Sequence, residues 1–343
     1  MTATVEISVD ELRDRMARHE PTTIVDVRPS DERAEWSIPG SVHIDAYERL
    51  KAGDKHVLDG LATPADVPVV TVCAAGRTSL IAADLLSQRG VDVMSLSGGM
   101  KAWSLAWNTA PIALPGSTAQ VIQVRRTGKG CLSYIVGAGG EAVVIDASLD
   151  PTVYLDIAAE HGWTITRVLD THIHADHLSR AKQLADAVGA ELFLPAQNRA
   201  RFPHRAVHGG DVVEVGPVNI EAIHTPGHTM ESTCYLVRGE AVFTGDTLFL
   251  SSVGRPDLHA DVEQARHRAS LLYGSVKQLL GLEPDVRVLP GHTSSPPEFD
   301  GVAITERVGV VAERLDYWLE SEPAFIDRIL ARIPPTPPNF ERI

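Results

Sequence analysis

Three histidines and an aspartate fall within six consecutive positions, in the pattern His-x-His-x-Asp-His over residues 172–177. Imidazole nitrogens and carboxylate oxygens are the ligands that zinc and iron commonly take in proteins. Three turns further along the chain end in a residue of the same kind, each directly after a glycine, which permits the tight bend that aims the next side chain. We therefore predict a metal site that draws on His172, His174, Asp176, His177, His228, Asp246 and His292.

A second candidate centre is Cys73, the first residue of the loop 73–79. This loop runs from a strand-like segment at 69–72 into a helical pattern at 79–88. Backbone N–H groups at the start of a helix stabilise a thiolate or a persulfide, so Cys73 is a candidate nucleophile, and Arg77 could meet an anionic sulfur donor. A buried structural cysteine is the alternative. Cys131 and Cys234 lie in strand-like segments, and we expect both to pack in a core.

The elements that would position these residues fall into two domains. Strands alternate with helices in residues 1–108, which indicates a parallel α/β sheet whose ligand sites lie at the carboxyl ends of its strands. Prolines and a glycine interrupt the pattern at 109–117, the predicted linker. Residues 118–343 begin with β-rich segments, and apolar residues from Leu178 to Val188 follow a helical stripe, which places the histidine cluster in the loop before that helix.

The composition limits the partners. The net charge of -14 argues against nucleic acid and against an anionic membrane, both of which would repel the chain. The amino-terminal segment has acidic residues where a signal peptide needs an apolar core, so we expect a cytoplasmic protein. The sequence leaves open whether it forms a homo-oligomer.

Several motifs of the first domain occur in the order found in rhodanese domains. Segments 26–28, 38–41, 73–79 and 97–103 resemble that family, and the likeness covers about residues 5–108. It implies that Cys73 carries a sulfane sulfur, exchanged with thiosulfate or sulfite, within a cradle of the N–H groups of residues 74–78. Related phosphatases need an arginine six positions after the cysteine, and Ser79 stands there, which argues against phosphatase activity. Asp26 and Arg28 are expected to form a structural ion pair.

The second domain resembles the metallo-β-lactamase fold over about residues 118–295, which implies an αββα sandwich. Two chemistries fit the resemblance. In a dinuclear site, with two zinc ions or an iron–zinc pair, all seven residues bind and Asp246 is shared, as in the thioester hydrolase glyoxalase II. In a mononuclear site, His172, His228 and Asp246 hold one Fe(II), as in persulfide dioxygenases. The other four residues then orient the ligands and carry protons.

Other features favour the dioxygenase. Segments 129–134, 252–257 and 334–340 resemble that family and its rhodanese fusions, and the chain after His292 is short for the helical lid of glyoxalase II. A sulfur-carrying neighbour also suits an enzyme that oxidises persulfides. The expected reaction converts a small-molecule persulfide, O2 and water into sulfite and a thiol. By resemblance Arg255 binds the thiol carrier, and a salt bridge to Asp257 is the alternative. The identity of the thiol and the direction of sulfur transfer stay open.

Overall fold

The computed structural model describes residues 5–64, 66–128, 130–174, 178–258 and 260–333. The chain forms two compact units, each assembled from separate stretches of sequence. The first unit joins residues 1–108 with 125–131 and 294–301, and the second joins 109–124, 132–293 and 302–343. No helix among the described residues has both the length and the apolar character needed to cross a membrane.

The first unit contains a five-stranded parallel sheet in the order β1-β5-β4-β2-β3. Its elements in chain order are β1 (Val5–Ile7), α1 (Val9–Ala17), β2 (Thr23–Asp26), α2 (Ser30–Glu35), β3 (Val42–His43), α3 (Tyr47–Lys51), β4 (Val69–Val72), α4 (Arg77–Ser87), β5 (Val93–Leu96) and α5 (Gly99–Trp103). Successive residues of β4 enter opposite cores, Val69 on one face and Val70 on the other, because side chains alternate along a strand. The prediction of a parallel α/β sheet is confirmed.

Residues next to the helix ends explain where α1 and α4 begin. Ser8 and Glu11 form a capping box at the start of α1, in which each side chain accepts a hydrogen bond from the other's backbone N–H. Helix α4 begins at Arg77 after Gly76, whose φ of 81° suits a residue without a side chain. Cys73 therefore lies between the end of β4 and the start of α4, as predicted.

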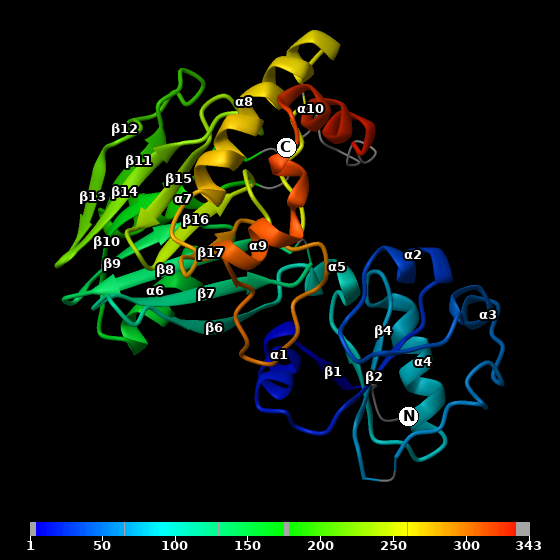
Figure 1. The fold of residues 1–343 in the computed structure, drawn as a ribbon. Coiled ribbons are helices and arrows are strands. Elements are labelled where there is room, and N and C mark those ends of the chain that lie inside the picture. Colours follow the sequence, from blue (N-terminus) through cyan, green and yellow to red (C-terminus); the bar gives the residue numbers. More distant parts are fainter. Residues whose placement is uncertain (1–4, 65, 129, 175–177, 259, 334–343) are drawn as a thin grey trace. The chain divides into compact units, whose positions relative to one another are not determined.

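The second unit is a sandwich of two sheets with helices outside them (Figure 1). The first sheet has the order β12-β11-β10-β9-β8-β7-β6 and the second the order β13-β14-β15-β16-β17-β18. The first sheet and its helices comprise β6 (Trp107–Ala113), β7 (Gln120–Arg126), β8 (Leu132–Ala138), β9 (Glu141–Ile145), α6 (Pro151–Glu160), β10 (Thr164–Leu169), α7 (Ala181–Val188), β11 (Glu191–Pro195) and β12 (Arg205–Val207). The second comprises β13 (Val212–Val215), β14 (Val218–His224), β15 (Thr233–Val237), β16 (Ala241–Gly245), α8 (Val262–Leu280), β17 (Arg287–Pro290), β18 (Glu306–Arg307), α9 (Val308–Arg314), the 3-10 helix η1 (Asp316–Leu319) and α10 (Glu322–Ala331).

At least two apolar cores among the described residues hold this sandwich together. One lies between the sheets and joins residues such as Tyr134 of β8 and Phe243 of β16, whose rings meet edge to face with centroids 5.0 Å apart. Another lies between the second sheet and helices α8, α9 and α10. The predicted αββα architecture is confirmed, and buried Cys131 and Cys234 pack in the interior as expected.

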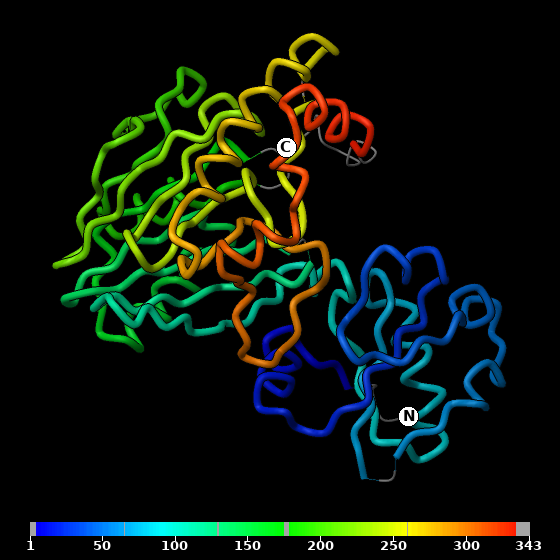
Figure 2. Tube along the Cα trace, viewed as in Figure 1, coloured from blue at the N-terminus to red at the C-terminus, as the bar shows by residue number. Residues whose placement is uncertain are grey.

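Two details differ from the sequence-based expectations. The segment 109–117, predicted as a linker, begins inside strand β6, which can be followed into β7 in Figure 2. Pro111 does not prevent this strand because β6 is at the edge of its sheet, where a missing N–H costs no ladder hydrogen bond. The helix predicted from Leu178 begins only at Ala181, and Leu178 is 66% exposed.

Candidate metal centre and sulfur-carrier loop

Strand direction brings the candidate ligands to one edge of the sandwich. Strands β16 and β17 run parallel with Gly245 opposite Pro290, so the residues that follow them, Asp246 and His292, emerge together. Strand β14 is two antiparallel steps from β16 and therefore runs the same way, which brings the turn of His228 to that edge. His172 reaches it from the other sheet, just after β10.

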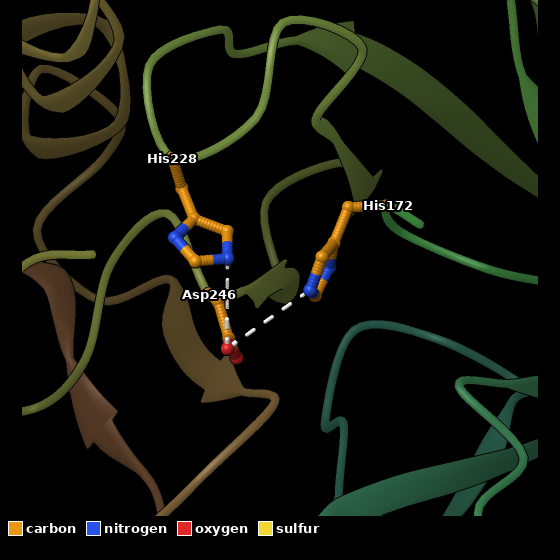
Figure 3. A group of neighbouring side chains, drawn as sticks. All are labelled: His172, His228 and Asp246. Atoms are coloured by element: carbon orange, nitrogen blue, oxygen red, sulfur yellow. Dashed lines mark ion pairs between the residues drawn. The ribbon is translucent and has the colours of Figure 1, made fainter. Parts of the chain in front are cut away.

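His172, His228 and Asp246 converge (Figure 3). Their possible ligand atoms all lie within 4.8 Å of one another. Nε2 of His172 and Nε2 of His228 are each 3.9 Å from Oδ2 of Asp246. All three side chains are largely buried, and the arrangement matches the three-residue set predicted from the sequence.

The hydrogen bonds of His172 fix its tautomer. Thr171 Oγ1 donates to the Asp146 carboxylate, at 2.9 Å from Oδ2, and lies 2.9 Å from Nδ1 of His172. Because the Thr171 proton is used by Asp146, Nδ1 of His172 must be the donor in the second contact. The lone pair then lies on Nε2, the atom that faces Asp246. Burial, reinforced by neighbouring His174, lowers the pKa of His172 well below its usual value, which favours the neutral ring.

His228 is held in the same tautomer by a different partner. Its Nδ1 lies 3.0 Å from the backbone oxygen of Arg255, which can only accept, so Nδ1 carries the proton. Asp246 is oriented by His292, whose Nδ1 is 2.6 Å from Oδ1. Burial raises the pKa of Asp246, but the histidines around it, first His292, lower it more, and the net pKa lies well below its usual value. Asp246 is thus a carboxylate whose Oδ2 faces Nε2 of both histidines.

These three residues fit a metal ion. Nε2 of His172 is buried and has no hydrogen-bond partner among the described residues, a costly state for an imidazole nitrogen unless an ion accepts its lone pair. Metal–ligand bonds of ~2.1 Å place two ligand atoms up to ~4.2 Å apart, and both 3.9 Å separations lie within that limit. Two histidines and a carboxylate suit iron or zinc.

The remaining residues of the predicted set have different positions. His174 belongs to a second buried group, with Nε2 3.3 Å from Asp146 and 3.8 Å from Asp170. Burial opposes protonation of His174, but these two carboxylates outweigh it and raise the pKa of His174 well above its usual value. Asp176, His177 and the segment 334–340 lie outside the described residues.

Arg255 forms the salt bridge to Asp257 that was the alternative to binding the thiol carrier. Its Nε and Nη2 form a fork on Asp257, at 2.9 and 2.7 Å. Arg255 also lines a pocket of about 470 Å³ into which His228 and Asp246 open. The backbone oxygen of Arg255 accepts a hydrogen bond from Nδ1 of His228, and this is its direct contact with the metal-binding group.

The Cys73 loop joins β4 to α4. Cys73 is 2% exposed, and its Sγ lies 3.4 Å from Oγ of Ser79, which also accepts a hydrogen bond from Ser95. The backbone oxygen of Cys73 accepts from the N–H of Met100 at 2.8 Å, which ties the loop to α5. Arg77 is exposed at the first residue of α4. Asp26 and Arg28 form the expected buried ion pair, at 2.7 Å.

Sequence reasoning missed the residues that orient the ligands. Thr171 and Asp146 fix the ring of His172, although Asp146 is far from it in sequence. The signal available was Thr171 itself, which stands beside the first histidine of the motif. Ser79, noted only because it is not arginine, is the hydroxyl next to Cys73. Nothing in the sequence indicated that Arg328, Ile329, Arg332 and Ile333 line the pocket.

Comparison with known proteins gives two family matches. Residues 8–106 match the rhodanese-like domain family, and residues 126–292 match the metallo-beta-lactamase superfamily. Hydroxyacylglutathione hydrolase from Polaromonas sp. is 40% identical over 159 residues, which are 45% of this chain and 57% of the relative. The chain thus spans less than two thirds of the length of that relative.

Two further proteins are similar over a larger share of their length. Hydroxyacylglutathione hydrolase from Anaeromyxobacter dehalogenans is 33% identical over 209 residues, which are 58% of this chain and 79% of the relative. The solved structure of ETHE1 from Myxococcus xanthus is 30% identical, covers 62% of this chain and 91% of its own, and superposes with a TM-score of 0.54.

Proposed function

Because the chain belongs to the metallo-beta-lactamase superfamily and has a rhodanese-like domain ahead of the metal-binding domain, we propose that it is a two-site sulfur enzyme. At the metal centre, a low-molecular-weight persulfide, O2 and water become a thiol, sulfite and two protons. At the other site, Cys73 passes sulfane sulfur between a persulfide and sulfite or thiosulfate.

The convergence of His172, His228 and Asp246 carries the proposal for the metal centre. A set of two histidines and one carboxylate on one side of an iron ion leaves open positions for O2 and a sulfur atom. The second oxygen of Asp246 accepts a hydrogen bond from Nδ1 of His292, which holds the carboxylate in place. His174 is likewise engaged with Asp146 and Asp170.

The residues of the chain would act on this chemistry by orientation, proton handling and exclusion of water. Thr171 and the backbone oxygen of Arg255 keep both imidazole lone pairs on Nε2. His292 holds Asp246 through Nδ1 and can keep a proton next to that carboxylate. The apolar side chains of the pocket, such as Phe249 and Val253, limit the access of water.

A second candidate is the hydrolysis of a thioester at two metal ions. The curated relatives named hydroxyacylglutathione hydrolase favour it, and their names agree with the hydrolase better than with the dioxygenase. This function needs ligands for a second metal, and Asp176 and His177 would be required in addition to His292. The two candidates therefore differ in metal stoichiometry and in the need for oxygen.

Metal analysis combined with oxygen uptake distinguishes them. We expect one iron per chain, and oxygen consumption that releases sulfite with at least one of several small-molecule persulfides, glutathione persulfide among them. Two metal ions per chain, with cleavage of lactoylglutathione and no oxygen uptake, would instead establish the hydrolase. Two variants test the ligand assignment: His228→Ala should lose iron and oxygenase activity, whereas His204→Ala, outside the metal group, should keep both. Unchanged iron in His228→Ala would contradict the assignment.

A further inference from the structure

The pocket beside the metal centre has walls from two distant parts of the chain. One wall is the loop that follows β16, with Phe249, Val253 and Leu258. The other is the end of the described chain, with Ile329 and Ile333. The volume of about 470 Å³ lies in the range of small-molecule sites, which is ~300–1,000 Å³. Because His228 and Asp246 open into it, the pocket is where the unreactive part of a substrate would extend.

Helix α10 forms a fixed wall of this pocket. Phe325 is fully buried, and its ring lies 5.2 Å from that of Tyr273 on α8. Arg266 of α8 also bonds Asp327 of α10 at 3.0 Å. Arg328 and Ile329 lie in the last turns of α10, and Arg332 and Ile333 directly follow its end. All four residues line the pocket, so this wall places two arginines beside two isoleucines.

The three arginines of the pocket differ in their partners. The guanidinium of Arg255 forks onto Asp257, and that of Arg328 bonds Glu320 and lies over the ring of Tyr317. Arg332, at the carboxyl cap of α10, is exposed and has no ion-pair partner in the part of the chain that the structure describes. In a chain with a net charge of -14, an unneutralised cation at an apolar pocket provides a site for an anion.

We infer that Arg332 binds a carboxylate or phosphate on the thiol that carries the substrate sulfur, and that an apolar arm between that anion and the sulfur fills the pocket. This inference rests on the proposed function, because it takes the sulfur-bearing molecule as the occupant. A guanidinium suits either anion, since both match its paired donors. The carrier is therefore an acidic thiol with an apolar section. A thiol that is polar along its whole length would leave Ile329 and Ile333 without an apolar partner.

The test measures binding of free thiols, so it requires no turnover. Isothermal titration calorimetry on the metal-loaded full chain, without oxygen, would compare mercaptooctanoate, mercaptooctyl phosphate and neutral mercaptooctanol. We expect Arg332→Gln to weaken binding of the anionic thiols about five- to tenfold and that of mercaptooctanol less than about twofold. The control Arg205→Gln removes the same charge from exposed strand β12, outside the pocket, and should leave all three affinities unchanged.

The outcomes separate this inference from the proposed function. The ratio of the two anionic affinities in the unsubstituted chain identifies whether carboxylate or phosphate is the better match. Equal weakening of all three thiols by Arg332→Gln, or no weakening of the anionic ones, overturns the inference. A chain that binds anionic thiols through Arg332 but takes up no oxygen with their persulfides keeps the inference and rejects the dioxygenase.

Discussion

Replacing Thr171 by valine tests whether the tautomer of His172 controls metal binding. Valine has nearly the same shape as threonine but lacks Oγ1, which contacts Nδ1 of His172 at 2.9 Å and both oxygens of Asp146 at 2.9 and 3.1 Å. Asp146 keeps the backbone N–H of residue 171, at 2.7 Å, so the substitution does not leave that carboxylate without a donor. The main loss is the acceptor for the buried Nδ1–H of His172.

The expected magnitude follows from that loss. A buried donor without an acceptor costs about 1–3 kcal/mol. The cost falls on the metal-bound state, because only there must Nε2 present its lone pair and Nδ1 keep the proton. Since about 1.4 kcal/mol is a tenfold change in affinity, we expect metal binding to weaken about 10–100-fold, as is usual when a partner of a ligating histidine is removed.

Competition with a chelator of known affinity measures this change directly. Thr171→Ser is the matched control, because it keeps the hydroxyl and should bind metal within about threefold of the unsubstituted chain. Circular dichroism and the sulfurtransferase activity of the other domain report whether each variant is folded. Equal metal affinity in the valine and serine variants would refute the reasoning, since the hydroxyl would then have no part in orienting His172.

Three further predictions concern the rhodanese-like domain. Cys73→Ser should abolish thiosulfate-dependent sulfur transfer, measured as thiocyanate formed from cyanide, and leave metal content and oxygen uptake intact; loss of both activities would contradict two separate sites. Gly99→Ala should disrupt the same loop, because φ at Gly99 is +57° and an added Cβ would lie 2.6 Å from the backbone N of Gly76. The same thiocyanate assay should then show a large decrease in sulfur transfer. The pKa of Asp26 lies below its usual value because Arg28 and Arg33 outweigh the effect of burial. The stability that this carboxylate contributes is therefore present above about pH 4 and is lost as the pH falls through the lower folded pKa. In thermal melts, Asp26→Asn should therefore lose less stability in that acid range than the unsubstituted chain does.

The sequence by itself determined the local features of both sites. The capping box of α1, the strand before Cys73 and the glycine turns before the candidate ligands depend on residues close together in the chain, so their patterns were sufficient. The αββα architecture was expected from the resemblance to the metallo-β-lactamase fold, which is carried by the metal-ligand motifs at the ends of strands. The three-residue metal group was also among the alternatives, as the set that the resemblance to persulfide dioxygenases implies.

Only the tertiary structure decided how each ligand is held. The acceptor for His228 is the backbone oxygen of Arg255, and the carboxylate behind Thr171 is Asp146, which comes from the end of another strand. Backbone carbonyls leave no mark in a sequence, and partners brought together by sheet packing have no fixed spacing. For the same reason no sequence pattern indicated that Arg332 lines the pocket, because the position of α10 depends on Phe325 packing against α8.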